Sequence, residues 1–278
     1  KITDDGAIFK SPLDGSKHEL TPEKSIQIQF GLGVDMMVCL DDCPPNDFNK
    51  SGLEKSVERT IAWAKRCRRE YDKQIKKRKI KDSARPLIFS VIQGGAEIDL
   101  RKYCAGELVK IGFDGYSFGA RPIDAAGNFL GEVLKRTAEF IPENSLRFAL
   151  GIGTPEDIVR CASYGWDMFD CVIPTREGRH GRLFLWKRNS KSKILNPKQI
   201  LNSKSQILNF YQTINILNSK FSTDFSPINS NSKLPELRDH SNAYLNHLFK
   251  LKDPLGARLA TLNNLEFYLE LMKKLREK

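Results

Sequence analysis

The sequence of 278 residues lacks any apolar run of about 18 residues, the length that a membrane-spanning helix needs. Its first residues, Lys1–Gly6, lack the apolar core of a secretory signal peptide. They also lack an initiator Met, from which we expect a fragment or a trimmed chain. Neither the dinucleotide-binding glycine motif nor the P-loop motif occurs, so two common nucleotide sites are excluded.

The cysteines do not form the pairs that zinc fingers or redox motifs need. There are 6 of them, spread along the chain, and no Cys-x-x-Cys occurs. Without a secretory signal, this pattern predicts reduced thiols in a cytoplasm. Cys39 and Cys43 have no Cys or His nearby to complete a metal set, so we interpret them as strand and loop residues.

Positive charge is abundant, with 45 Lys and Arg against 34 Asp and Glu, a net charge of +11. Such an excess favours a polyanionic partner such as nucleic acid, although a solvated lysine-rich surface would give the same count. No acidic residue occurs between Glu177 and Asp224. Within this stretch we predict a low-complexity basic insertion over residues 187–209, either an RNA-facing loop or a drifting surface loop.

Short apolar runs alternate with amphipathic helical patterns along the first part of the chain. A hairpin over Ala7–Leu20 and a helix from Thr21–Pro22 come first, and Lys50–Lys77 carries a long apolar stripe. The predicted strands are Asp35–Leu40, Leu87–Ile92, Phe113–Phe118, Phe148–Leu150 and Met168–Val172. This alternation predicts parallel β/α units, in either a barrel or a doubly wound sheet.

Polar residues and glycines follow these strands, where the chemistry of parallel β/α folds gathers. The segments are Asp41–Cys43, Gln93–Gly95, Gly119–Arg121, Gly151–Pro155 and Asp170–Arg176. A carboxylate and an amide can read the donor and acceptor edge of a purine, and a further acid can be a nucleophile or a base.

Each of these side chains also has a structural alternative. Asp41 or Asp42 could cap a helix, Gln93 could satisfy loop backbone, and Asp170 could pair with Arg176. Their shared edge favours the functional interpretation. The cations that follow Asp170 suit a substrate carried on a phosphodiester chain, and they are Arg176, Arg179, His180 and Arg182.

Several motifs together resemble the tRNA-guanine transglycosylases. They are Asp167–Arg176 (DMFDCVIPTR), Asp14–His18 with Leu20–Glu23, Val91–Gly95 with Leu100–Arg101, Gly151–Asp157 (GIGTPED) and Ser241–Leu245 (SNAYL). The resemblance covers nearly the whole chain except the insertion. It implies an α/β fold, the irregular (β/α)8 TIM-type barrel, and one catalytic domain over residues 1–278.

The resemblance also implies an activity, the exchange of the wobble guanine of certain tRNAs for a 7-deazaguanine. Asp170 would be the catalytic nucleophile, forming a covalent ester with the ribose. Asp41 and Gln93 would hold the base edge, with backbone at Gly119 and Ala120, and Leu150 would press on the base face. The residues implied to touch the tRNA anticodon loop are Gly151, Ile152, Gly153, Thr154, Pro155, Glu156, Asp157, Thr175, Arg176, Glu177, Gly178 and Arg179.

The chain departs from the family pattern at its start. The family's second catalytic acid lies in a segment ahead of Lys1, together with the first barrel strands. We therefore expect a barrel incomplete at its N-terminus, and a chain of residues 1–278 that is inactive or unstable on its own.

A second departure concerns metal. The family's zinc ligands, three Cys and one His, match Ser232, Leu234, Leu237 and Asn263 here, none of which is a competent ligand. We therefore expect no zinc and no other cofactor, and residues 221–263 would be a remnant of the zinc-binding subdomain. Family members usually dimerise near this region, so a homodimer stays open.

A third departure is Gly119-Ala120-Arg121, where the family has Gly-Gly-Leu, which leaves the base preference open. Ile123 falls where bacterial members of the family carry a branched apolar residue, which mildly favours the small aminomethyl deazaguanine precursor over queuine.

The alternative function is a non-catalytic tRNA-binding paralogue or partner subunit. A third alternative is the same chemistry at another tRNA position, as in archaeosine synthesis. We favour it less, because the given sequence has no appended RNA-binding domain.

Overall fold

The computed structural model describes residues 1–45, 48–124, 126–187 and 210–277, and all of the predicted insertion except Lys187 lies outside them. The described chain forms two compact units. The first contains Lys1–Gly151 and Tyr164–Phe169, and the second contains Ile152–Ser163 and Asp170–Lys278. The predicted single domain over residues 1–278 stays a prediction.

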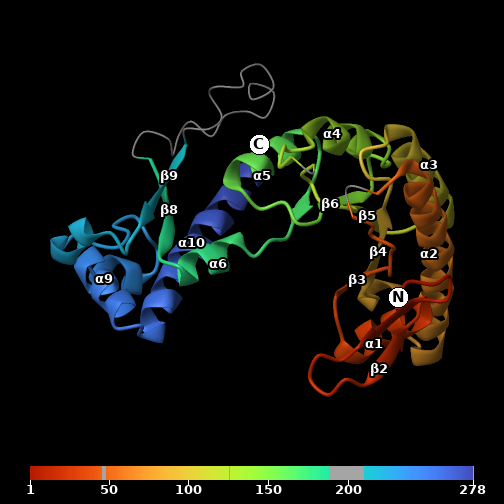
Figure 1. Cartoon of the computed structure of the whole chain (residues 1–278), viewed down its shortest axis with the longest axis horizontal. Helices are drawn as coiled ribbons and strands as arrows, with labels where there is room; N and C mark the ends of the chain where they lie inside the picture. Colours follow the sequence, from red (N-terminus) through yellow and green to blue (C-terminus); the bar gives the residue numbers. More distant parts are fainter. Residues whose placement is uncertain (46–47, 125, 188–209, 278) are drawn as a thin grey trace. The chain divides into compact units, whose positions relative to one another are not determined.

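A parallel sheet forms the centre of the first unit (Figure 1). Its strands are β3 (Met36–Val38), β4 (Leu87–Ile92), β5 (Gly115–Phe118), β6 (Leu146–Ala149) and β7 (Met168–Phe169). They pair in chain order, β3-β4-β5-β6-β7, with Phe89 opposite Gly115 and Ser117 opposite Phe148. A doubly wound sheet reverses its strand order at a switch point, whereas a barrel keeps it. The curled five-stranded sheet is therefore that of a partial TIM-type barrel, and the predicted α/β class is confirmed.

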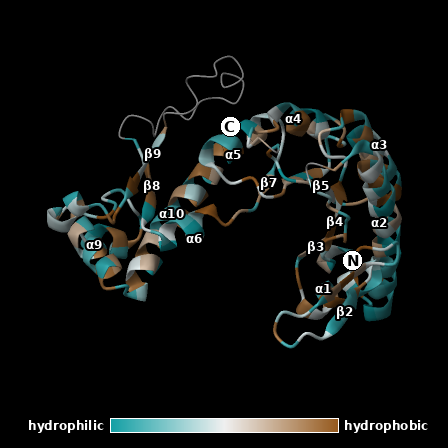
Figure 2. Cartoon of the chain, in the orientation of Figure 1, coloured by the Kyte–Doolittle hydropathy of each residue, from teal (hydrophilic) through white to brown (hydrophobic). Residues whose placement is uncertain are grey.

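Helices connect the strands of the first unit. They are α1 (Pro22–Leu32), α2 (Lys50–Arg78), α3 (Ile98–Ile111) and α4 (Gly131–Glu139), with a 3-10 turn η1 (Asp82–Ala84). Helix α1 begins as predicted, because the Thr21 side chain accepts from the Lys24 amide and Pro22 occupies its first turn. The predicted stripe of α2 is buried from Leu53 to Tyr71 and half-buried at its last residue, Ile75, and Figure 2 shows hydrophilic residues along much of this helix.

The predicted hairpin is β1 (Ala7–Lys10) paired antiparallel with β2 (Lys17–Leu20), and Gly15 in its turn has a φ of 72°.

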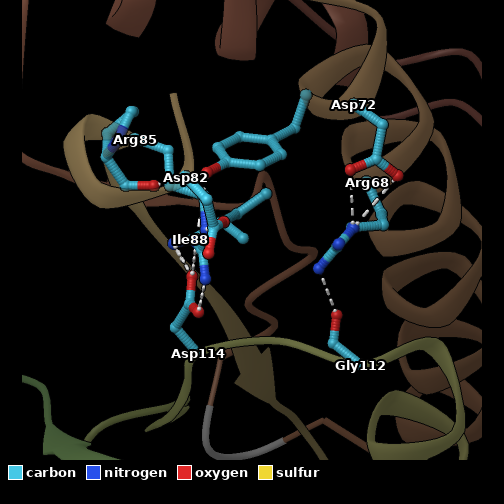
Figure 3. A network of polar contacts seen from close by, with 9 residues as sticks. Arg68, Asp72, Asp82, Arg85, Ile88, Gly112 and Asp114 are labelled. Carbon is cyan, nitrogen blue, oxygen red and sulfur yellow. Dashed lines mark hydrogen bonds and ion pairs between the residues drawn. The ribbon is translucent and has the colours of Figure 1, made fainter. Parts of the chain in front are cut away.

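The amino ends of β4 and β5 are joined by a bidentate ion pair, in which Arg85 contacts Asp114 at 2.6 and 2.7 Å. Figure 3 shows that the same carboxylate accepts from the Ile88 amide, at 2.8 Å. Burial opposes ionisation, but these donors keep the pKa of Asp114 below its ordinary value.

The second unit is built on the long helix α10 (Pro254–Arg276), which packs against α5 (Pro155–Ser163), α6 (Ile173–Arg179), α9 (Asn242–Lys250) and strand β8 (Arg182–Trp186). Strand β9 (Tyr211–Asn215) pairs antiparallel with β8, and η3 (Ser219–Thr223) and α8 (Pro235–Asp239) complete the unit. Its core consists of Leu183, Ile216, Phe221, Ile228, Leu237, Leu245, Leu248, Leu259 and Ala260.

Three predicted strands are too long. Asp35–Leu40 contains the shorter β3, and Phe113–Phe118 contains the shorter β5, while Phe148–Leu150 is shifted against β6. The third is the run that contains β7. The apolar run Met168–Val172 was expected to be extended throughout, but β7 ends at Phe169 and Val172 already precedes helix α6. Pro174 lies in the first turn of that helix, where a missing N–H costs nothing.

No helix among the described residues combines the length and the apolar character that crossing a bilayer requires.

Candidate active site

A carboxyl–amide pair lies where β3 and β4 end. The Gln93 side chain is fully buried and donates from Nε2 to Asp41 Oδ2 at 2.6 Å. Burial raises the pKa of Asp41 despite this hydrogen bond. Within the described residues, the buried Gln93 Oε1 has no hydrogen-bond partner. An unsatisfied buried acceptor costs about 1–3 kcal/mol, so a ligand with N–H donors at this point would stabilise the pair.

The neighbouring acid, Asp42, is committed to helix α2. Its carboxylate contacts Arg59 at 2.5 Å, and its backbone amide donates to Thr60 Oγ1 at 3.0 Å. The helix is capped by Asn49, so the alternative in which either acid caps it is wrong. Gln93 likewise binds a carboxylate rather than loop backbone. Asp42 therefore anchors the loop, and Asp41 is the acid that contacts Gln93.

The turn after β5 lies against Gln93. A Cβ added at Gly119 would lie 2.4 Å from Gln93 Nε2, so this position admits no side chain. The next residue, Ala120, has a φ of 80°, a conformation that costs an L-residue roughly 1 kcal/mol or more. Leu150, at the end of β6, is half-buried, and Gly151 is exposed with a φ of 74°.

In the second unit, Asp170 is exposed and directly follows the last residue of β7 in the chain. The segment 152–157 of the same unit, which leads into α5, is held by hydrogen bonds. Tyr268 on α10 donates to the Gly153 carbonyl at 2.7 Å, and Gly153 lies against Cys171. Asp170 is therefore flanked by a segment that α10 supports.

Many of the residues implied to touch RNA already have roles within the second unit. Ile152, Gly153, Pro155 and Gly178 are buried. Glu156 accepts from the Tyr211 hydroxyl at 2.7 Å, and Asp157 accepts from Thr154 at 2.6 Å. Their contacts with RNA stay predictions, and the buried members can act only through the loop conformation they support.

Helix α6 presents two of the four cations that the sequence predicts, and Arg182 begins β8. Arg176 and Arg179 are exposed, and Glu177 contacts Arg176 at 3.5 Å and Arg182 at 3.1 Å. The helix is fixed by Asn264 of α10, whose Nδ2 donates to Pro174 O at 3.0 Å and Arg182 O at 2.9 Å. Sequence reasoning missed Asn264, because a polar residue in a helical pattern is usually exposed.

The structure brings the predicted residues together in two separate sets. Asp41, Gln93, Gly119, Ala120 and Leu150 belong to the first unit, as does Gly151. Asp170 belongs to the second, with Ile152, Gly153, Thr154, Pro155, Glu156, Asp157, Thr175, Arg176, Glu177, Gly178 and Arg179. In the first set, printed distances join Asp41 to Gln93 and place Gly119 against Gln93.

The four positions that the resemblance implies for zinc hold a hydroxyl, two alkyl groups and an amide. Ser232 donates to Glu266 at 2.5 Å, and Asn263 donates to the Phe184 carbonyl at 3.0 Å. Leu237 is fully buried in the apolar core, and Leu234 packs against that core. This chemistry does not fit zinc. Across the described ranges, no group of three or more His, Cys, Asp or Glu is placed to hold a metal.

The chain is similar over its whole length to known proteins. The queuine tRNA-ribosyltransferase (TGT) family model matches residues 1–278. Queuine tRNA-ribosyltransferases of Thermoanaerobacter pseudethanolicus and Halothermothrix orenii are each 37% identical, covering 100% and 99% of this chain. That of Staphylococcus aureus is 35% identical. The chain spans only 65% of the first two relatives and 64% of the third. By this match the chain belongs to the queuine tRNA-ribosyltransferase, or tRNA-guanine transglycosylase, family.

Proposed function

We propose that the complete protein exchanges the wobble guanine of tRNA for a 7-deazaguanine, through an ester between Asp170 and the ribose. The observation that carries this proposal is the contact between the half-buried Asp41 and the buried Gln93, whose amide oxygen has no partner among the described residues. Guanine and 7-deazaguanines share an edge with N–H donors and a carbonyl acceptor. The Asp41 carboxylate and Gln93 Oε1 accept from the donors, and the backbone N–H of Ala120, in the peptide group that follows Gly119, donates to the carbonyl.

The chemistry needs one nucleophile. A carboxylate oxygen of Asp170 attacks C1′ of the ribose, and the bond from C1′ to the guanine nitrogen breaks. Guanine takes up a proton as it leaves, and the incoming base gives up a proton when its nitrogen displaces Asp170. One difficult substitution becomes two easier ones, as in retaining glycosidases. The tRNA chain stays intact throughout.

The cations of α6 fit the same substrate. Arg176 and Arg179 are exposed close to Asp170 in the chain, where guanidinium groups can bind the phosphates flanking the reacting nucleotide. The target base must leave its stack to reach Asp41 and Gln93, and single-stranded anticodon loops make this step inexpensive. A cytoplasmic location and a homodimer also stay proposals.

The test uses the complete protein, an anticodon stem-loop and labelled guanine. Asp170→Asn should abolish a denaturation-resistant RNA adduct and lower exchange by about 10³- to 10⁶-fold, while leaving RNA binding largely intact. Asp167→Asn is the matched control, because Asp167 accepts from the Arg147 amide at 2.9 Å and an amide oxygen can replace that acceptor. An adduct that survives Asp170→Asn would show that Asp170 is misassigned. RNA binding with no adduct in the unsubstituted protein would favour the non-catalytic paralogue.

We further propose that residues 1–278 alone are inactive. The reason is the second acid that the resemblance places ahead of Lys1. Base exchange by this chain at the rate of the complete protein would contradict that expectation.

A further inference from the structure

The first unit contains a charged side chain that the proposed reaction does not use. Arg101 lies on α3 and is fully buried, with none of its surface exposed. Within the residues that the structure describes, it forms no ion pair; its guanidinium lies over the Phe118 ring, 4.0 Å from the centroid. Burial lowers the pKa of Arg101 to about 9. An unpaired buried charge is costly to a fold, so its contacts must repay that cost.

All three polar contacts of Arg101 are with backbone carbonyls beside the base-binding residues. Nε donates to Gly95 O at 2.6 Å, Nη1 to Ile92 O at 3.2 Å and Nη2 to Gly119 O at 2.9 Å. Two of these carbonyls lie on either side of Gln93, and the third lies immediately before Ala120. One rigid guanidinium therefore ties the loop after β4 to the turn after β5.

The loop is fitted to this arginine. Gly94 has a φ of 138°, and a Cβ there would lie 2.8 Å from the Arg101 backbone nitrogen. The Gly119 amide donates to Ile92 O at 3.0 Å, so this carbonyl accepts hydrogen bonds from both Gly119 and Arg101. Because Gly119 in turn contacts Gln93 Nε2, a shift of either loop would change the position of the base-edge amide.

The contact with Gly119 also has an electronic consequence. The Gly119 carbonyl and the Ala120 N–H belong to one peptide group, and a donor to the carbonyl polarises the N–H. Among the described residues, no acceptor contacts the Ala120 N–H. A cation on the carbonyl therefore strengthens a donor available to a ligand carbonyl.

We propose that Arg101 is a positioning residue for base recognition, which holds Gln93 and the Gly119–Ala120 peptide in register and strengthens the Ala120 N–H as a donor. This inference rests on the proposed function, because it assigns Arg101 to the base subsite of that reaction. Arg101 does not touch the base itself.

The test measures labelled guanine exchange into tRNA by the complete protein, with KM determined separately for guanine and for tRNA. Arg101→Lys keeps a cation but loses the fork that spans three carbonyls, and Arg101→Gln removes the charge. Both should raise KM for guanine by about 10- to 100-fold, the scale expected for a small misplacement of binding groups. KM for tRNA should change less than about twofold, and the lysine variant should be the less impaired.

The control is Arg85→Lys at the amino ends of the same strands. Arg85 is a partly buried arginine that holds Asp114 at 2.6 Å, and its substitution should lower the melting temperature without changing KM for guanine. An unchanged guanine KM in folded Arg101 variants would overturn the inference, as would unfolding of both variants at 25 °C. Absence of any exchange by the unsubstituted protein would instead refute the proposed function.

Discussion

The two units hold their candidate site residues by different means. In the first, a buried cation and close glycine contacts fix the ends of parallel strands, as Arg101 and Gly119 do. In the second, neutral amides of α10 hold α6 and β8, through Asn263 and Asn264. The difference teaches that the part proposed to bind the base depends on close spacing at the strand ends, whereas the part carrying Asp170 depends on one helix acting as a support.

The largest expected effect is at the close contact of the first unit. Gly119→Ala places a methyl against Gln93 Nε2, at 2.4 Å in the present arrangement, so the amide must leave its contact with Asp41. Guanine exchange should fall by about 100-fold or more, because a small displacement of binding groups is amplified in the rate. The measurement is kcat/KM for guanine in the complete protein.

Gly106→Ala is the control, since a Cβ there meets nothing within 4 Å. It should leave exchange unchanged. Equal kinetics for the two variants would remove the distinction between the units, because the base-reading part would then tolerate looser spacing.

A second, smaller effect is expected where the family places zinc. Glu266 on α10 accepts from Ser232 Oγ at 2.5 Å and from the Lys233 amide at 2.6 Å, and so ties the loop to the helix without metal. Glu266→Ala should cost about 1–3 kcal/mol of unfolding free energy, through unsatisfied groups. The exposed Glu236→Ala should cost less than about 0.5 kcal/mol.

Metal removal sharpens the same point. Incubation with EDTA should leave the melting temperature of the complete protein unchanged, because the donor set here is a hydroxyl, two alkyl groups and an amide. A fall in melting temperature with chelator, reversed by zinc, would contradict this account of the second unit.

The smallest expected effect is the loss of stability of the first unit in acid. Arg66 holds Glu23 at 2.7 Å and lowers its pKa to about 2, against an ordinary 4.5. A carboxylate whose folded pKa is depressed stabilises the fold above its unfolded pKa, and that stability is lost as the pH falls through the folded pKa. Unfolding free energy of the first unit should therefore fall between about pH 4.5 and pH 2, by about 1 kcal/mol from this half-exposed pair.

Glu23→Gln should lower stability at pH 7 and flatten this part of the pH profile, as measured by urea denaturation. A profile that keeps its full slope in the variant would show that the ion pair contributes nothing measurable. Asp114, with its pKa also lowered, supplies an independent acid-sensitive contact in the same unit.

Much of the first unit could be predicted from local pattern. The hairpin turn at Gly15, the cap at Thr21 and the buried stripe of α2 each follow from residue spacing. The placement of Asp41 and Gln93 on one edge followed from strand polarity, and their contact bears it out. The barrel order required the resemblance, because periodicity does not encode which strands pair.

The polar residues buried by tertiary contacts could not be predicted. Arg101, Asn264 and Glu266 have polar side chains within helical patterns, and such residues usually face solvent. Arg101 and Asn264 are buried and Glu266 is half-buried, through contacts with carbonyls and loops far away in the chain. The early end of β7 was missed because an apolar run does not distinguish a strand from the first turn of α6.

The central claim is that a carboxylate oxygen of Asp170 becomes bonded to the ribose of the target nucleotide. The direct measurement is peptide mapping by mass spectrometry after the complete protein is trapped with an anticodon stem-loop and digested. The account predicts that the mass of the ribose-bearing fragment is carried at Asp170, with Asp167 unmodified. A modified residue other than Asp170, or guanine release with no trapped species at all, would contradict it.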